Sequence, residues 1–299
     1  MRISAIDLGS NAARMIVAEW QGDRFEILKK YRVPLRLGTD VFQTGSISQV
    51  TMKKAEECFQ NFAEVNARME VIKCRAVATS ATREAQNKNE FVTRIKNTSK
   101  IGLEIIDGAL EGKLVFEAVK HEVNLKKKNS LLIDVGGGSV EITHVEMGNI
   151  KNSQSFPLGT VRMLEFLRQR KMSESHIKLV LGDLLRPVAE FFDRKMSGVA
   201  FDLSVGTGGN LECMAKLKTQ LLLDLAHESV LTHELGLIFN QLLQIPIKDR
   251  VHILGMREDR ADVIVPEVAV VEMILRQAGI DKINIPGVGL RDGLLFSMI

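Results

Sequence analysis

Residues 131–143 read LLIDVGGGSVEIT, and the rest of the chain can be read outward from this stretch. Apolar positions lead into a single acid, Asp134, then come the glycines Gly136, Gly137 and Gly138, and an alternating apolar and polar run leads away. That order is typical of a strand, a tight loop and a second strand. Glycine has no Cβ, so backbone N–H groups in such a loop can turn toward a bound anion. An ordinary hairpin with a glycine-rich turn would read the same way, and this segment alone leaves both interpretations open.

The same pattern occurs a second time near the N-terminus. Residues 5–11, AIDLGSN, repeat the order of residues 132–138, LIDVGGG, again after an apolar strand and before an alternating one. Two such hairpins predict an internal duplication. We therefore expect two related domains, at residues 1–120 and 121–299, that each bring one loop to a shared cleft, with the last helix able to pack back on the first domain. A phosphate chain held from both sides would fit that cleft.

The composition excludes several classes of protein. Of the 299 residues, 45% are hydrophobic and 26% are charged, as in ordinary globular proteins of about two domains. The formal net charge of +3 is too small to indicate a nucleic-acid-binding protein. No apolar run approaches the roughly 20 residues that a membrane-spanning helix needs, and no signal-peptide pattern follows Met1. We expect a cytoplasmic protein with neither nucleic acid nor membrane as a partner.

The three cysteines give no sign of a metal or disulfide site. Cys58, Cys74 and Cys213 are odd in number, far apart and in apolar surroundings. We interpret them as reduced core residues.

Polar residues beside the first loop and the next strand are candidates for binding phosphate. Ser10 and Asn11 can donate to phosphate oxygens, and Arg14 could add a charge-assisted contact, although an exposed strand arginine would look the same. Residues 71–78 form another expected strand, and Arg83 follows its C-terminal end, where ligands bind in α/β sheets. Arg83 is thus a candidate phosphate clamp, or an ordinary arginine on a surface helix.

Two further segments have both a structural and a functional interpretation. Glu111 lies in the first turn of a helix expected at residues 110–121, where the helix dipole favours a carboxylate, so by itself it is a capping residue. A third glycine loop, residues 206–210, follows a strand expected at residues 199–205. This loop could contact a nucleotide or further phosphate.

Helix signals are clear at three other places. Ser48 is expected to cap a helix whose apolar face includes Met52 and Phe59. Residues 177–192 are expected to form one helix with a kink at Pro187. Thr232 is expected to cap a helix that runs to residue 243.

Eight segments together resemble a known family. In chain order they are DLGSNAARMIV (7–17), ATSATREA (78–85), IIDGALEGKLVF (105–116), LIDVGGGSVEIT (132–143), LGTVR (158–162), VGTGG (205–209), DRADVIVP (259–266) and GLRDG (289–293). They resemble the exopolyphosphatase and guanosine pentaphosphate phosphohydrolase family, Ppx/GppA, of the actin-like ATPase superfamily, over nearly the whole chain. The resemblance implies an α/β fold of two ribonuclease-H-like domains with the active site in the cleft between them, in the family's short, two-domain form.

The resemblance also implies an activity. It implies Mg²⁺-dependent hydrolysis that releases terminal phosphate from inorganic polyphosphate, from guanosine pentaphosphate, or from both. A monovalent cation is an optional further cofactor, and a homodimer is one assembly to expect. The family's catalytic glutamate lies in a segment of the form SGxEEA, and its second Glu matches Glu111, which is therefore implied as the general base that orients and deprotonates water.

The resemblance assigns the remaining site residues. Asp134 and Glu141 match family acids associated with the metal, and Asp7 is their duplicate in the first domain. The phosphate-binding residues that it implies are Ser10, Asn11, Arg14, Arg83, Gly136, Gly137, Gly138, Ser139, Gly206, Thr207 and Gly208.

The chain departs from the family pattern near the implied base. Leu110 replaces the first Glu of SGxEEA and Asp107 replaces its Ser. Ala12 and Ala13 stand where Ser-Phe is common, and Gly112 stands where Ala is usual. The loss of a carboxylate beside the base leaves the rate and the substrate preference open, and with them the alternative of a non-catalytic sensor of polyphosphate or guanosine phosphates.

A kinase or ATPase of the same superfamily is a further alternative. It would need an acceptor pocket and an adenosine site beside residues 206–210. Aromatic residues make up 5% of the chain, with one Trp and one Tyr, and they offer no obvious stacking platform for guanine. The sequence therefore does not choose between polyphosphate and guanosine pentaphosphate.

Overall fold

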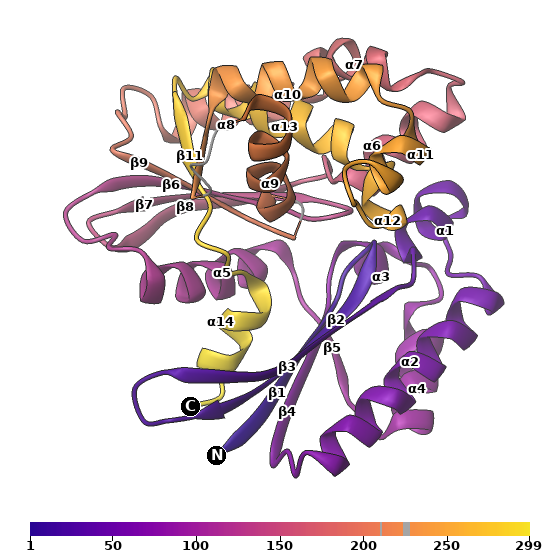
Figure 1. The fold of residues 1–299 in the computed structure, drawn as a ribbon. Helices are drawn as coiled ribbons and strands as arrows, with labels where there is room; N and C mark the ends of the chain where they lie inside the picture. Colours follow the sequence, from indigo (N-terminus) through magenta and orange to yellow (C-terminus); the bar gives the residue numbers. More distant parts are fainter. Residues whose placement is uncertain (210, 224–227) are drawn as a thin grey trace. The chain divides into compact units, whose positions relative to one another are not determined.

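A computed structural model describes residues 1–209, 211–223 and 228–299, and the chain divides into two compact units. Unit 1 contains residues 1–118 and 290–299, and unit 2 contains residues 119–289. The border between them falls within helix α5 (Gly108–Glu122). Each unit has one β-sheet covered by helices (Figure 1), so the predicted α/β class is confirmed.

The sheet of unit 1 has the strand order β3-β2-β1-β4-β5. β2 is antiparallel to both β1 and β3, whereas β4 is parallel to both β1 and β5. Its strands are β1 (Arg2–Leu8), β2 (Ala12–Trp20), β3 (Phe25–Pro34), β4 (Lys73–Ala78) and β5 (Leu103–Ile105). Besides the start of α5, its helices are α1 (Leu37–Thr44), α2 (Gln49–Arg68), α3 (Ser80–Glu84), α4 (Lys88–Ser99) and α14 (Leu290–Phe296).

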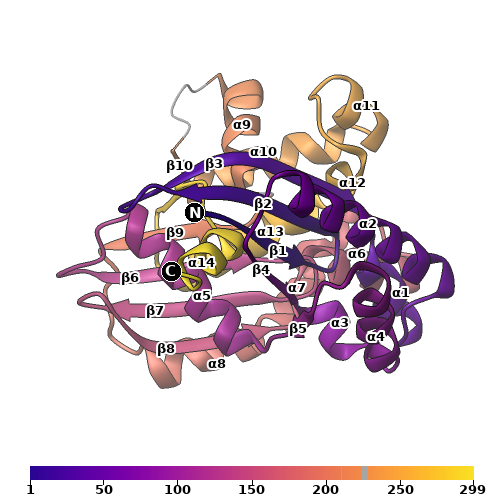
Figure 2. The same ribbon diagram turned by 90° about the horizontal axis from the view of Figure 1, so that it is seen from below.

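The core of unit 1 lies between one face of this sheet and helices α2 and α4. Ile6 and Met15 from the strands pack there with Phe59 from α2. The side chain of Ser48 accepts a hydrogen bond from the backbone N–H of Thr51, which confirms Ser48 as the N-cap of α2. Helix α14 packs on β1 and β2 (Figure 2), so the end of the chain is part of unit 1.

The sheet of unit 2 has the strand order β10-β11-β9-β6-β7-β8. Its strands are β6 (Asn129–Val135), β7 (Val140–Glu146), β8 (Asn149–Phe156), β9 (Leu203–Thr207), β10 (Ser229–Leu231) and β11 (Lys282–Asn284). Its helices are α6 (Thr160–Gln169), η1 (Glu174–His176), α7 (Ile177–Leu184), α8 (Arg186–Lys195), α9 (Leu211–Leu222), α10 (Thr232–Gln244), α11 (Ile247–His252), α12 (Glu258–Ala261) and α13 (Ile264–Gln277). Helix α13, whose inward residues are all apolar except for two acids, contributes most of its length to the core.

The two sheets repeat one another strand by strand. Strands β8, β7, β6, β9 and β11 follow the same order and the same parallel or antiparallel pairing as β3, β2, β1, β4 and β5. Even the register irregularity recurs, between Val17 and Ala18 in β2 and between His144 and Val145 in β7. In Figure 2, β6, β7 and β8 lie side by side as the meander that this order describes. This repetition is what the predicted duplication into two ribonuclease-H-like domains requires.

Two helix predictions in unit 2 are wrong. The single kinked helix over residues 177–192 is in fact two helices, α7 and α8, which meet at Leu185. Pro187 occupies the first turn of α8, where the backbone N–H that proline lacks would have no hydrogen-bond partner within the helix. Thr232 does not cap α10, because Leu231 is the N-cap and the Thr232 hydroxyl donates to the carbonyl of Ile280.

All three cysteines are free thiols; Cys58 lies in the core of unit 1 and Cys213 packs against that of unit 2, so only for Cys74 is the predicted core position wrong. Cys58 is buried, Cys213 is half-buried and Cys74, at the exposed start of β4, is exposed. Within the part of the chain that the structure describes, none of the helices combines the length and the apolar character of a membrane-spanning helix.

Candidate active site

Two acids of unit 2 lie opposite each other where β6 and β7 meet the glycine loop. Asp134 on β6 and Glu141 on β7 are register partners, and both are buried. Glu141 accepts a hydrogen bond of 2.7 Å from Ser155 on β8, and Asp134 accepts one from the hydroxyl of Thr207 on β9. Four neighbouring strands therefore carry the acids and the hydroxyl groups that orient them. Such outer partners fix the direction of carboxylates in metal sites.

The loop between these strands is a tight turn held against helix α6. The N–H of Gly136 donates to the carbonyl of Ser139 at 3.0 Å, and the N–H of Thr160 donates to the carbonyl of Gly136 at 3.1 Å. Gly159, just before α6, approaches so closely that a Cβ there would lie 2.3 Å from the backbone of Gly138. Because no such contact is tolerated, glycine is required where the two backbones meet.

The third glycine loop has clear packing reasons for its glycines. A Cβ on Gly206 would lie 2.7 Å from the side chain of Ile283 on β11. Gly208 has a φ of +112°, and a Cβ there would lie 2.6 Å from the carbonyl oxygen of Val135. These glycines therefore do not by themselves indicate a ligand, and Thr207 is already engaged with Asp134. Asn210, at the end of this loop, lies outside the described residues.

The first loop of unit 1 has the same turn. The N–H of Gly9 donates to the carbonyl of Ala12 at 3.1 Å, as Gly136 does to Ser139. Ser10 is buried, and its hydroxyl accepts a hydrogen bond of 3.2 Å from the N–H of Ala81 in the first turn of α3. The Ser10 side chain thus ties the loop to α3. Asn11 follows it, and its backbone carbonyl accepts from two N–H groups at the start of the segment that leads into α1.

Asp7 has an arginine as its neighbour. It is the register partner of Arg14, whose Nη1 lies 3.5 Å from its Oδ2. Burial raises the pKa of Asp7, while Arg14 and Arg291 lower it. By the repeat of the two sheets, Arg14 occupies the position that Glu141 has in unit 2. Asp7 therefore has positively charged neighbours, and it does not belong to the group of clustered acids described below.

Glu111 is held at the start of α5 by residues of unit 1. Its carboxylate lies 3.7 Å from the guanidinium of Arg83, which also donates to the carbonyl of Ile106 at 2.8 Å. Asp107 accepts a hydrogen bond of 2.8 Å from the N–H of Leu110 through its carboxylate. Asp107 is thus the N-cap of α5 and fills the capping role that a serine at this position would have.

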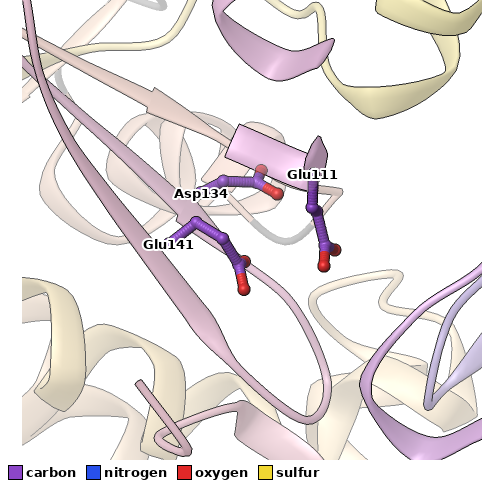
Figure 3. Close-up of side chains that lie close together, drawn as sticks. All are labelled: Glu111, Asp134 and Glu141. Carbon is purple, nitrogen blue, oxygen red and sulfur yellow. The ribbon is translucent and has the colours of Figure 1, made fainter. Parts of the chain in front are cut away.

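Three buried acids form the one group among the described residues that could hold a metal ion. Glu111, Asp134 and Glu141 each offer a carboxylate oxygen, and these three atoms lie within 4.8 Å of one another. Figure 3 shows the three side chains, from the first turn of α5, from β6 and from β7. All the donors are carboxylate oxygens, the ligands that hard divalent cations such as Mg²⁺ prefer. The donor set therefore fits a divalent metal.

Three residues that support the site were not predicted from the sequence. Ser155 orients Glu141 and could have been found by extending the hairpin register to the third strand. Arg291 acts on Asp7 and lies in the motif GLRDG, whose arginine was not assigned a role. Gly159, in the motif LGTVR, shapes the loop around Gly138.

Comparison with known proteins identifies the family. The sequence profile of the Ppx/GppA phosphatase family matches residues 15–299. A solved exopolyphosphatase from Cytophaga hutchinsonii is 26% identical with a TM-score of 0.87, and the match covers 100% of this chain and 97% of that one.

Two more distant structures share the fold. The Ppx/GppA protein from Aquifex aeolicus is 24% identical with a TM-score of 0.76, over 100% of this chain and 97% of that one. An exopolyphosphatase-like protein is 22% identical with a TM-score of 0.85, over 99% and 97% of the two chains. Because the profile matches residues 15–299 of the 299-residue chain, this protein belongs to the Ppx/GppA phosphatase family.

Proposed function

We propose that this protein is a Mg²⁺-dependent phosphohydrolase that releases terminal phosphate from inorganic polyphosphate, from guanosine pentaphosphate, or from both. The observation that carries the proposal is the group of three buried carboxylates, Glu111, Asp134 and Glu141. The family is one of phosphatases, and the solved relative from Cytophaga hutchinsonii is an exopolyphosphatase. Both support the same class of reaction.

Asp134 and Glu141 would hold the metal ion. Their hydroxyl partners, Thr207 and Ser155, keep one oxygen of each carboxylate in a fixed direction, which lowers the entropy lost when a cation binds. When bound, Mg²⁺ would neutralise charge on the phosphoryl oxygens of the substrate. Phosphoryl transfer needs little covalent help, so positioning and charge neutralisation would supply most of the rate enhancement.

Glu111 would act as the general base. A carboxylate within hydrogen-bond reach of a water molecule can orient it and take its proton as the water attacks the terminal phosphorus in line with the leaving oxygen. The N-cap at Asp107 and the arginine at residue 83 fix the position of the first turn of α5 and of its glutamate. A glutamate held in this way keeps a fixed orientation, as a base that must orient one water molecule requires.

The two glycine loops would bind the same phosphate chain. In unit 1, Asn11 and Arg14 offer an amide and a guanidinium beside the loop, and in unit 2 the turn at residues 136–139 offers backbone N–H groups and the Ser139 hydroxyl. Glycine loops bind phosphate through backbone N–H groups, and arginine binds it through a planar pair of donors. Phosphate would thus be bound by both loops while the acids act at its terminal group.

The decisive experiment measures phosphate release from polyphosphate in the presence of Mg²⁺. Glu111→Gln removes the base while keeping the side-chain shape, and its rate should fall by roughly 100-fold or more. Glu122→Gln, the same change at an exposed position in the last turn of α5, is the matched control and should stay near the wild-type rate. A Glu111→Gln variant that is as active as the wild type would mean that another group is the base.

The same assay separates the alternatives. Guanosine pentaphosphate and polyphosphate, supplied side by side at equal phosphate concentration, show which one is hydrolysed. Tight binding of either compound without phosphate release would favour the sensor function, and it would point to Leu110 as the departure that matters. Micromolar ATP binding with transfer to an acceptor would favour a kinase.

A further inference from the structure

One row of side chains crosses three strands of unit 1 at a single register. Asp7 on β1 is the partner of Arg14 on β2, and Arg14 is the partner of Arg32 on β3. Residues paired directly across strands project from the same face, with Cβ atoms roughly 5 Å apart. The three side chains therefore leave the sheet next to one another, at the end that carries the loop with Ser10 and Asn11.

Unit 2 has the same row with the opposite charge. Asp134, Glu141 and Ser155 are partners across β6, β7 and β8 at the matching register. That row contains two carboxylates and a hydroxyl, whereas the row of unit 1 contains one carboxylate and two guanidinium groups. One copy of the repeated meander is thus built to attract a cation, and the other is built to attract an anion.

We propose that Arg32 is a second phosphate-binding arginine, which binds the phosphoryl group next to the one held by Arg14. The row would then be a subsite for two successive groups of a condensed phosphate chain. This inference rests on the proposed function, since it names the part of the substrate that unit 1 binds.

The position and chemistry of Arg32 support this role. On the same face, the preceding row consists of Ala5, Ile16 and Lys30, so the paired charges begin only at the level of the loop. Two like charges directly opposite each other destabilise a sheet. Asp7, 3.5 Å from Arg14, offsets one of the two positive charges, and a polyanion lying across both arginines would add further negative charge to the row. Arginine, with its planar fork of donors, matches a phosphate better than lysine does.

Lys30 provides a matched control. It lies on the same face of the same strand as Arg32, two residues earlier, which is roughly 7 Å along the strand, and it is exposed. Arg32→Ala and Lys30→Ala each remove one positive charge from this face. A general electrostatic attraction would be weakened equally by both, whereas a direct contact would be lost only in Arg32→Ala.

The test measures KM and kcat for polyphosphate with the wild type, Arg32→Ala, Arg32→Lys and Lys30→Ala. Loss of a charge-assisted contact should raise KM about tenfold or more in Arg32→Ala, with kcat within about twofold. Arg32→Lys should recover part of the loss, and Lys30→Ala should stay within about twofold of the wild type. An unchanged KM in Arg32→Ala, or an equal rise in Lys30→Ala, would overturn the inference.

A binding measurement keeps this result separate from the proposed reaction. Calorimetric titration of polyphosphate into Glu111→Gln, with and without Arg32→Ala, needs no turnover. Weaker binding on loss of Arg32 supports the subsite even if no variant releases phosphate, and in that case the proposed hydrolysis fails while the subsite stands. Equal binding with normal wild-type turnover would refute the subsite alone. Thermal denaturation of each variant shows whether a loss of binding reflects a loss of folded protein.

Discussion

Arg83 lies beside the carboxylate of Glu111 and is itself hydrogen-bonded to the backbone carbonyl of Ile106, just after β5. Its Nη1 lies 3.7 Å from Glu111 and donates to the carbonyl of Ile106 at 2.8 Å. The Glu111 side chain is 6% exposed and that of Arg83 is 25% exposed. An arginine placed in this way restricts the acid and still has further N–H donors for another partner. Its observed contacts favour a role in positioning Glu111 over a role limited to clamping phosphate.

Arg83→Met should therefore act mainly on the chemical step. We expect kcat for polyphosphate to fall by about 10-fold or more, since a misplaced base loses much of its effect. KM should change less. Arg83→Lys keeps the positive charge but loses the guanidinium contacts with Glu111 and Ile106. Its kcat should therefore lie between those of the wild type and Arg83→Met. A rise in KM at constant kcat would instead assign Arg83 to phosphate binding.

Thr207→Val should weaken the effect of the metal. The Thr207 hydroxyl donates to Asp134, and loss of such an outer partner costs about 10- to 100-fold in metal affinity. The matching position of the first sheet carries Val77, beside Asp7, so the fold accepts valine there. We expect the Mg²⁺ concentration for half-maximal activity to rise by about tenfold. Thr207→Ser keeps the donor and should behave as the wild type does. An unchanged Mg²⁺ dependence in the valine variant would separate Thr207 from the metal site.

The local features of the site could be predicted from the sequence, and the long-range ones could not. The glycine turns after Asp7 and Asp134 follow from residue order alone, because a turn depends on neighbouring residues. Thr207 was expected to bind phosphate. Its hydroxyl faces Asp134 because β9 pairs in parallel with β6, and no local pattern encodes that pairing. The contact between Gly159 and Gly138 likewise depends on how α6 packs on the loop.

Helix ends were the other limit of the sequence interpretation. The apolar periodicity around Pro187 is the same for one kinked helix and for two helices in succession, so only the structure distinguishes them. At α10 the cap was misplaced by one residue: Glu234 accepts from the N–H of Leu231, which makes Leu231 the N-cap and leaves Thr232 inside the helix. The sequence likewise does not show what Asp107 does, because a carboxylate near the start of a helix can cap the helix or belong to a site.

Asp107→Ala should lower stability more than it lowers catalysis. Its carboxylate caps α5 through the N–H of Leu110, and loss of an N-cap costs about 1 kcal/mol. Asp107→Ser, which has the residue that the family pattern places there, should restore most of that stability because serine caps as well as aspartate does. Urea denaturation of the three proteins measures the difference. If the serine variant were as unstable as the alanine variant, the carboxylate would have a role beyond capping.

His144 should make the protein less stable in acid. The ring is buried in β7 and packs edge-on against Phe201, with 5.6 Å between ring centroids. Burial lowers the pKa of His144, which Glu146 raises and Lys151 lowers further. The unfolded chain then binds more protons at this residue than the folded protein does, so the free energy of unfolding falls as the pH drops below about 6.5, the ordinary histidine value. Loss continues until the pH reaches the lower pKa of the folded state.

The test measures the free energy of unfolding by urea denaturation at about pH 7.5 and about pH 5.5, on either side of the ordinary histidine pKa of about 6.5. His144→Phe removes the titrating group while keeping a ring against Phe201, so its stability should decline less between the two conditions than that of the wild type. His252→Gln removes an exposed histidine on α11 and keeps the buried His144. Its stability should decline as much as that of the wild type. Parallel declines in all three proteins would show that groups other than His144 set the acid sensitivity, because stability depends on pH only through groups that bind different numbers of protons in the folded and unfolded states.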